Sequence, residues 1–247
     1  MQPFEMLDRG DGVRLAYRRQ PGKAPTLVWM SGYRSDMDGN KAEALAAWAA
    51  VNGQAYLRFD YSGHGRSDGA FEDQGIEAWL SDSLQMIDKL TEGPLVLVGS
   101  SMGGWLALLA AKARPERVKA LLLIAPAWDM TARLMHRLPP EARDALAQTG
   151  RWEVASPYGG TMIYTAKMIA EGDRHLLGDA PYEFAGSVRI LQGAQDPDVP
   201  AAHAEALRAK LRAPDVRLHL VPDGDHRLSR AQDLALLTET AAELSKA

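Results

Sequence analysis

Short apolar runs recur along the chain and alternate with segments whose apolar residues repeat at helical spacing. Residues 13–19 alternate apolar and polar side chains, which predicts a half-buried strand. Further runs are apolar on both faces and end in small or turn-forming residues, as strands of a covered parallel sheet do. These runs are residues 26–30, 55–59, 94–99, 119–125 and 188–193. Residues 215–221 alternate again and predict an edge strand.

Helical spacing fills the intervals between these strands. In residues 76–90, apolar side chains recur every three or four positions from Ile76 to Leu90 and share one helical face. Further helices are predicted over residues 41–50, 102–113, 201–212 and 229–245. Strands that alternate with helices predict an α/β fold, with a doubly wound, mostly parallel sheet of about eight strands.

One interval breaks this rhythm. About 60 residues lie between the strand ending near Ala125 and the strand beginning near Val188, which is too long for a crossover loop. Proline begins and glycine ends residues 139–150, which predicts a helix, and residues 157–161 predict a turn. We interpret residues 126–186 as a small helical cap inserted into a single domain of residues 1–247. Its apolar and aromatic side chains could line a substrate pocket: Trp128, Met130, Leu134, Met135, Trp152, Tyr158, Met162, Tyr164 and Met168.

Composition and charge narrow the function classes. The net charge of −4 lacks the basic excess of a nucleic-acid-binding protein. The absence of cysteine excludes disulfides, thiolate metal sites and a cysteine nucleophile. No apolar run approaches the roughly 20 residues of a membrane span, and the N-terminus lacks the apolar region of a secretory signal. We therefore expect a cytoplasmic protein.

The pattern Gly-x-Ser-x-Gly occurs twice, centred on Ser67 and on Ser101. A nucleophilic serine in this pattern sits on a tight turn directly between a buried strand and a helix. Residues 95–98 and 102–113 provide that strand and helix around Ser101. No helical pattern follows Ser67 at once, so its glycines are interpreted as a loop. Ser100 lacks glycines two positions away on either side and is interpreted as a small packing residue.

A serine nucleophile needs a general base, and the base needs an orienting carboxylate. Of the six histidines, His226 follows the last predicted strand on a loop at the carboxyl edge of the sheet. Open α/β sheets hold their sites at this edge. Asp196 and Asp198 follow the preceding strand; we favour Asp196, which comes first, and interpret Asp198 as a cap of the next helix. The predicted triad is Ser101, Asp196 and His226.

The oxyanion that forms during acyl transfer needs backbone N–H donors. One donor is expected from Met102, the residue after the nucleophile. The other is expected from Tyr33, which follows Gly32 in the loop after the strand of residues 26–30. This chemistry uses no metal and no cofactor.

Several segments together resemble the α/β-hydrolase superfamily over the whole chain: GSSMGG at residues 99–104, LQGAQDPDVP at 191–200 and DGDHRLS at 223–229. FDYSGHGRSDG at residues 59–69 and the stretch 138–152 are similar to small serine hydrolases of one group. That group comprises the palmitoyl-protein thioesterase also known as mycophenolic acid acyl-glucuronide esterase. The resemblance implies hydrolysis of carboxylic esters or acyl thioesters, with the triad on Ser101, Asp196 and His226.

The chain departs from this family pattern at Ser31, where a histidine commonly precedes the glycine. Because the expected donor is a backbone N–H, the oxyanion hole should survive this change. No mitochondrial targeting segment is visible, so we do not carry a mitochondrial location over.

Other activities share part of this pattern. A dehalogenase or epoxide hydrolase would carry aspartate in place of Ser101. A carbon–carbon bond hydrolase uses the same triad and differs in its cap, and a non-catalytic binding module usually lacks part of the triad. The expected partner is a small-molecule ester or thioester, with an acylated protein as a further candidate. The oligomeric state is left open.

Overall fold

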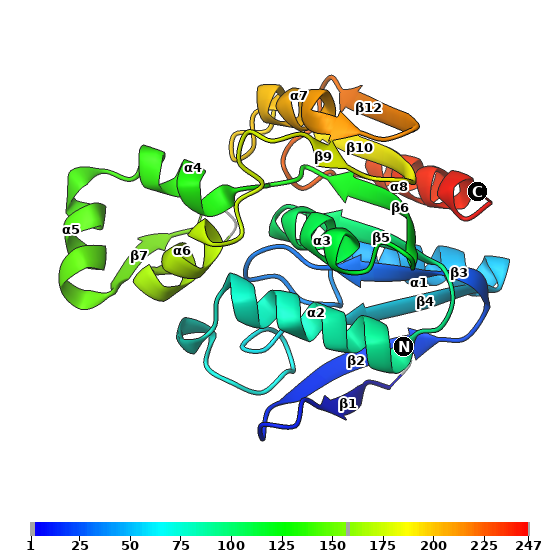
Figure 1. The fold of residues 1–247 in the computed structure, drawn as a ribbon, viewed down its shortest axis with the longest axis horizontal. Helices are drawn as coiled ribbons and strands as arrows, with labels where there is room; N and C mark the ends of the chain where they lie inside the picture. The colour runs from blue at the N-terminus through cyan, green and yellow to red at the C-terminus, as the bar shows by residue number, and fades with distance from the viewer. Residues whose placement is uncertain (1–2, 157–158, 247) are drawn as a thin grey trace.

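The computed structural model describes residues 3–156 and 159–246. Its centre is an eight-stranded sheet of order β1-β2-β4-β3-β5-β6-β10-β12 (Figure 1). The pairs β1–β2 and β2–β4 are antiparallel and the remaining pairs are parallel. The strands are β1 (Glu5–Asp8), β2 (Arg14–Gln20), β3 (Lys23–Met30), β4 (Gln54–Phe59), β5 (Leu95–Ser100), β6 (Val118–Ile124), β10 (Ser187–Gly193) and β12 (Asp215–Val221). The predicted mostly parallel sheet is confirmed, with β12 at one edge and β1, which was not predicted, at the other.

Helices cover both faces of this sheet (Figure 1). Buried side chains of α2, α3 and α7 belong to the core on one face, and those of α1 and α8 to the core on the other. The helices are α1 (Asn40–Asn52), α2 (Ile76–Leu90), α3 (Met102–Ala113), α7 (Ala201–Lys210) and α8 (Ala231–Leu244), with a 3-10 turn, η1 (Phe71–Asp73). The apolar periodicity therefore predicted every helix of the two outer layers.

The central strand β5 explains why the site lies where it does. All six of its residues are buried, and it pairs with β3 on one side and β6 on the other. A strand enclosed in this way has no solvent-facing side chains, which accounts for its unbroken apolar sequence. Its carboxyl end leads directly into α3 at Ser101.

Between β6 and β10 the chain leaves the sheet and projects beyond the carboxyl ends of the strands (Figure 1). This β6–β10 segment (residues 125–186) contains α4 (Met130–Arg137), α5 (Pro140–Thr149), β7 (Arg151–Ala155), β8 (Thr161–Thr165), α6 (Ala166–Asp173) and β9 (Tyr182–Glu183). The helix predicted at residues 139–150 is confirmed, and Gly150 ends it with a left-handed φ of 72°. The β7–β8 hairpin was not predicted, and the expected turn at 157–161 falls partly outside the described residues.

A second short pairing alters the end of one predicted helix. Strand β9 pairs in parallel with β11 (Leu211–Arg212), so α7 ends at Lys210 rather than continuing to residue 212. The apolar spacing of residues 201–212 did not reveal this, because strand pairing with a distant segment overrides local helical preference.

Side chains join the β6–β10 segment to the rest of the fold. Glu171 on α6 accepts a hydrogen bond at 3.1 Å from the backbone N–H of Glu77, in the first turn of α2. A carboxylate at a helix N-terminus is stabilised by the unpaired N–H groups there.

The segment is also closed by a contact between its own ends. Asp129, before α4, accepts from the backbone N–H groups of Leu177 at 2.7 Å and Gly178 at 3.0 Å. The two ends of the segment are thus tied to each other.

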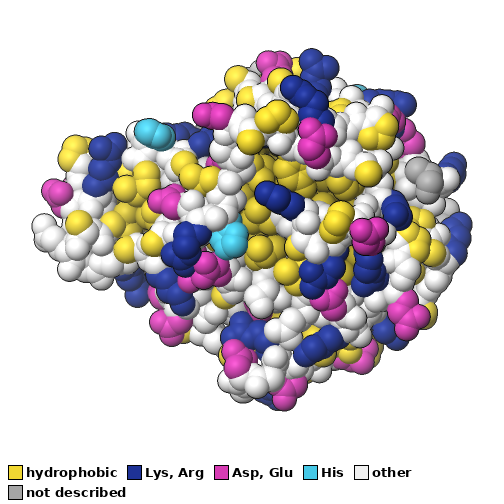
Figure 2. Space-filling model, in the orientation of Figure 1, with side chains coloured by type: hydrophobic (Ala, Val, Ile, Leu, Met, Phe, Trp, Pro, Cys, Tyr) yellow, Lys and Arg dark blue, Asp and Glu magenta, His cyan; other side chains and the backbone are white. Residues whose placement is uncertain are grey.

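The surface carries charges of both signs. On the face shown in Figure 2, Lys and Arg side chains are interspersed with Asp and Glu side chains. None of the helices in the described part of the chain combines the length and the apolar character needed to cross a membrane.

Candidate active site

Ser101 occupies a strained turn between β5 and α3. Its backbone has φ 54° and ψ −120°, a conformation that L-residues rarely adopt. Two neighbouring glycines make the turn possible. A Cβ on Gly99 would lie 2.2 Å from the carbonyl oxygen of Gly103, and a Cβ on Gly103 would lie 2.0 Å from that of Met30. The glycines of the motif are therefore required by close backbone packing.

Hydrogen bonds connect Ser101, His226 and Asp196 in a single chain. The Oγ of Ser101 lies 3.1 Å from Nε2 of His226, and Nδ1 of His226 lies 2.8 Å from Oδ2 of Asp196. The side chain of Asp196 is fully buried, whereas that of His226 is 15% exposed. The three predicted residues thus meet at the carboxyl ends of β5, β10 and β12.

The surroundings of Asp196 determine which nitrogen of His226 carries the proton. Burial alone would raise the pKa of the Asp196 carboxyl, but the hydrogen bond from His226, together with backbone N–H groups of Val199 and Asp198, holds this pKa below its ordinary value. An ionised carboxylate can only accept, so Nδ1 of His226 donates to it. Nε2 is then free to accept the hydroxyl proton of Ser101.

The loop that carries His226 is anchored on both sides. Asp225 accepts at Oδ1 from the backbone N–H of Leu228 at 2.9 Å, which stabilises the turn. From α1, Nζ of Lys41 donates to the carbonyl oxygen of Arg227, 186 residues away in the chain. Burial, reinforced by the charge of Arg227, lowers the pKa of Lys41 to about 8.

The two expected oxyanion donors lie beside the serine turn. Met102 is the first residue of α3, so its backbone N–H has no partner within the helix. Tyr33 follows Gly32, and a Cβ on Gly32 would lie 3.4 Å from the Cβ of Ser101. The loop after β3 therefore passes directly against the serine.

The side chain of Tyr33 has a second function that the sequence did not indicate. Its hydroxyl donates to the carbonyl oxygen of Ile163 in β8. Its ring stacks on Tyr164, with centroids 5.6 Å apart, and Tyr164 stacks in turn on Trp152 of β7. The expected oxyanion loop is thus held by the β7–β8 hairpin.

A buried glutamine supports the acid loop and was also missed. The Nε2 of Gln192 donates to Oδ2 of Asp196 at 3.0 Å and to the carbonyl oxygens of Gly193 at 3.1 Å and Val199 at 2.9 Å. These bonds close the loop around the carboxylate. The available signal was a polar residue at the end of β10, directly before the loop that carries Asp196.

Two further histidines pack near the site. The ring of His203 stacks on Trp128, with centroids 4.5 Å apart, and its Nε2 donates to the Trp128 carbonyl oxygen at 2.9 Å. Burial is the main cause that lowers the pKa of His203 to about 4, and the charge of Arg133 lowers it further.

His64 lies behind the Tyr33 loop. Its Nε2 accepts from the backbone N–H of Arg34 at 3.3 Å, and burial lowers its pKa to about 4.

The serine of the other Gly-x-Ser-x-Gly sequence is engaged elsewhere. The hydroxyl of Ser67 donates to the carbonyl oxygen of Asp60 at 2.6 Å and accepts from the backbone N–H of Ala16 at 2.8 Å. Ser100 is the last residue of β5 and is buried. Neither serine has the histidine contact that Ser101 makes.

The aromatic and methionine side chains that were candidate pocket residues divide into groups. Met168 is buried, and Tyr158 lies outside the described residues. The others are partly buried, and most of them pack on the core: Trp128, Met130, Leu134, Met135, Trp152, Met162 and Tyr164.

One group of side chains in the described residues has metal-ligand spacing. A ligand atom from each of Asp196, Asp198 and His226 lies within 4.8 Å of the others. However, Asp196 and His226 already bond to each other, and Oδ1 of Asp196 accepts from the backbone N–H groups of Asp198 and Val199 at 2.8 Å each. These bonds orient the group for proton transfer rather than for ligation.

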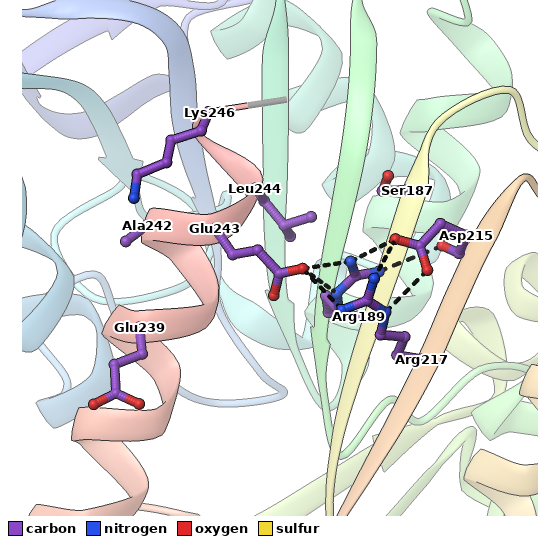
Figure 3. A pocket seen from close by; sticks show the side chains of 9 residues that line it. All are labelled: Ser187, Arg189, Asp215, Arg217, Glu239, Ala242, Glu243, Leu244 and Lys246. Carbon is purple, nitrogen blue, oxygen red and sulfur yellow. Dashed lines mark hydrogen bonds and ion pairs between the residues drawn. The ribbon is translucent and has the colours of Figure 1, made fainter.

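A separate surface hollow of about 580 Å³ lies at the opposite edge of the sheet (Figure 3). Ser187 and Asp215, which begin β10 and β12, line it. Its central Arg189 is paired with Asp215 and with Glu243, each at 2.6 Å. The hollow is remote from the serine, and its central Arg189 is already paired with two carboxylates.

Comparison with known proteins identifies the family. The profile of the family described as serine aminopeptidase, S33, matches residues 24–166. The mitochondrial palmitoyl-protein thioesterase ABHD10 of Mus musculus is 39% identical over 98% of this chain and 82% of its own length. The Homo sapiens protein of that name is 38% identical over 98% of this chain and 79% of its own. The chain belongs to the α/β-hydrolase family and is a hydrolase of ester bonds.

Solved structures agree with this assignment. The mouse alpha/beta hydrolase domain-containing protein 10 superposes with a TM-score of 0.92 at 38% identity, covering 98% of both chains. A putative hydrolase from Agrobacterium vitis superposes with a TM-score of 0.91 at 38% identity, covering 99% of this chain and 100% of that one. Both similarities extend over the β6–β10 segment as well as the sheet.

The expected cytoplasmic location is wrong by the same comparison, because the thioesterase relatives that match 98% of this chain are named mitochondrial. The physical basis of that expectation was weak. Absence of cysteine and absence of an apolar N-terminal segment bear on secretion, and they do not distinguish one reducing compartment from another.

Proposed function

We propose that this chain cleaves carboxylic esters or acyl thioesters through an acyl intermediate on Ser101. The observation that carries the proposal is the continuous hydrogen-bond chain from Ser101 through His226 to Asp196, with Ser101 on the strained turn. The palmitoyl-protein thioesterase relatives support ester or thioester hydrolysis.

Each residue has a defined step. His226 accepts the hydroxyl proton at Nε2 as Oγ of Ser101 attacks the acyl carbonyl carbon, and Asp196 stabilises the imidazolium that forms. The N–H groups of Met102 and Tyr33 bind the oxyanion. His226 then protonates the departing alcohol or thiol. It next takes a proton from water, whose oxygen attacks the acyl carbon, and returns that proton to Oγ as the carboxylic acid leaves.

The β6–β10 segment, close to the predicted residues 126–186, acts in this proposal as the cap of a single domain. Partly buried apolar side chains such as Met130, Leu134 and Trp152 supply a surface suited to an acyl chain or an aromatic group. The name palmitoyl-protein thioesterase belongs to relatives that match the segment over its whole length. A long acyl chain on a thioester is therefore the first substrate to try, with an acylated protein as the extended case.

Replacing the two adjacent serines tests the assignment. Ser101→Ala removes the nucleophile, so kcat/KM on p-nitrophenyl esters should fall at least about 10³-fold. Ser100→Ala should retain most of the activity and should still label with a fluorophosphonate probe. If Ser100→Ala abolished turnover and Ser101→Ala retained it, the nucleophile would be Ser100 and the assignment to Ser101 would be wrong. Failure of the folded wild-type protein to label would remove the acyl-serine mechanism altogether.

A further inference from the structure

Two arginines on α4 converge on the acid loop. Arg133 and Arg137 are four residues apart, so their side chains leave the same face of the helix. Nη2 of Arg133 and Nη1 of Arg137 donate to one acceptor, the carbonyl oxygen of Asp198, at 3.4 and 3.0 Å. The backbone N–H of Asp198 in turn donates to Asp196 at 2.8 Å. Both guanidinium groups therefore lie next to the loop that orients His226.

Neither of these two cations forms an ion pair with a carboxylate in the described residues. In the described part of the chain, neither guanidinium group has a carboxylate oxygen within 4.0 Å, and their hydrogen-bond acceptor is a neutral carbonyl. Arg133 is partly buried, and burial together with the charge of Arg137 lowers its pKa, although the more distant charge of Asp196 opposes this. Like charges four residues apart on a helix repel each other. The arrangement therefore costs free energy in the unliganded protein.

Arg189 shows how the same fold treats a buried arginine that has a structural role. Two carboxylates, from Asp215 and Glu243, each approach it at 2.6 Å (Figure 3). Buried charges are ordinarily paired in this way. The difference at the partly buried Arg133 indicates that its counter-charge comes from outside the chain, with the exposed Arg137 beside it as a second donor.

The aromatic stack beside the serine turn is within electrostatic range of one of these arginines. Burial raises the pKa of the Tyr164 hydroxyl, the charge of Asp198 raises it further, and the charge of Arg137 lowers it. Tyr164 therefore lies within electrostatic range of Arg137, and its ring stacks on Tyr33. The charges of Arg137 and of the acid loop therefore both reach the stack that holds the expected oxyanion donor.

We propose that Arg133 and Arg137 form an anion subsite that binds a carboxylate or phosphate group on the substrate. The subsite would make anionic esters or thioesters preferred over neutral ones. A guanidinium carries five N–H donors in a planar fork that matches two oxygens of such a group. Among the described residues, each of these two guanidinium groups uses one donor, toward the Asp198 carbonyl. The inference rests on the proposed function, because the anion must belong to a molecule cleaved at Ser101.

Matched substrates test the preference and locate the anion. For the acyl side, p-nitrophenyl adipate monoester is compared with its adipamide counterpart, in which a neutral carboxamide replaces the carboxylate. For the leaving group, 3-carboxyphenyl butyrate is compared with 3-carbamoylphenyl butyrate. On one of the two sides, kcat/KM for the carboxylate should exceed that for the carboxamide by about 10- to 100-fold.

Substitutions then assign the preference to these residues. In the double variant Arg133→Gln/Arg137→Gln, the carboxylate-to-carboxamide ratio of kcat/KM should approach one. In the single variant Arg137→Gln, at the exposed position, this ratio should fall by a smaller factor. Lysine at both positions should restore part of the ratio, because the charge returns without the fork. Arg143→Gln removes an equal charge from the exposed face of α5 and should keep the wild-type ratio.

The outcomes separate this inference from the proposed function. A wild-type ratio near one on both sides overturns the anion subsite, and so does a high ratio that persists in a folded double variant. In either case, turnover of p-nitrophenyl butyrate and fluorophosphonate labelling of Ser101 would leave the proposed function standing. Absence of turnover and labelling in the folded wild-type protein would remove both.

Discussion

The two halves of the candidate site are held by different kinds of interaction. Ser101 is positioned by backbone packing, because glycines at positions 99 and 103 let α3 approach β3 and β5. Tyr33 is positioned by side chains, through its bond to Ile163 and its stack on Tyr164. The triad half, with Met102 at the start of α3, belongs to the sheet, and the half that carries Tyr33, the other expected oxyanion donor, depends on the β6–β10 segment. A change in the segment should therefore alter the second half without displacing the first.

The largest effect is expected in the acid of the triad half. Asp196→Asn should lower kcat about 10⁴-fold, because an amide that donates to Nδ1 leaves His226 in the wrong tautomer. Asp198→Asn should cost far less, since residue 198 bonds to Asp196 and to the two arginines through its backbone N–H and carbonyl, which the substitution keeps. Steady-state kinetics on p-nitrophenyl esters measure both variants. The reverse order of losses would transfer the role of acid to Asp198.

The next largest effect is on stability. Gly103→Ala places a methyl group 2.0 Å from the carbonyl oxygen of Met30, so α3 must move away from β3. Overpacking of this kind should lower the free energy of unfolding by about 3 kcal/mol, and activity should fall with it. Gly39→Ala is the control, since its Cβ would meet nothing nearer than 3.8 Å. Urea denaturation compares the variants; equal midpoints would show that the glycine is not needed for packing.

The backbone-held half is also the half that could be predicted from sequence. The order of strand, Gly-x-Ser-x-Gly and helix located Ser101, and the loops after two later strands located Asp196 and His226. Each of these signals is local, because the turn and the strand ends lie within a few residues of the functional group. All the outer helices, and every strand of the central sheet except β1, followed from the same local periodicities.

The side-chain-held half could not be predicted in this way. The contacts of Tyr33 with Ile163 and Tyr164 join positions about 130 residues apart. The triad half has one such contact as well, the bond from Lys41 to Arg227 beside His226, which spans 186 residues. No local pattern encodes such pairs, because each depends on where the β6–β10 segment or the His226 loop settles in the folded chain. Partly buried aromatic residues in the segment were recognised, but their partners were not.

Acid should weaken the side-chain-held half first. His64 supports the Tyr33 loop and His203 packs on Trp128 at the start of the β6–β10 segment, and the pKa of each is lowered to about 4. An unfolded histidine has a pKa near 6.5, so the unfolded state binds more protons between pH 6.5 and about 4. Stability is therefore complete above pH 6.5 and decreases as the pH falls through this window, by about 2 kcal/mol per histidine.

Urea denaturation at pH 7 and pH 4.5 measures this decrease. His203→Gln should reduce the difference between the two pH values, because one of the titrating groups is gone. His219→Gln removes an exposed histidine from β12 and should leave the difference unchanged. A wild-type protein equally stable at both pH values would contradict the prediction.

The smallest effect gives the most direct comparison of the two halves. Tyr33→Phe keeps the stacked ring and removes the hydroxyl that donates to the buried carbonyl of Ile163, so stability should fall by about 1 kcal/mol. Tyr56→Phe removes a similar bond, to the Ala42 carbonyl oxygen at 3.2 Å, away from the site. Both variants should lose comparable stability, but only Tyr33→Phe should lower kcat, by several-fold with little change in KM, because the oxyanion N–H loses its anchor. If the two variants have the same kcat, the hairpin does not position the oxyanion donor, and both halves of the site depend on the sheet alone.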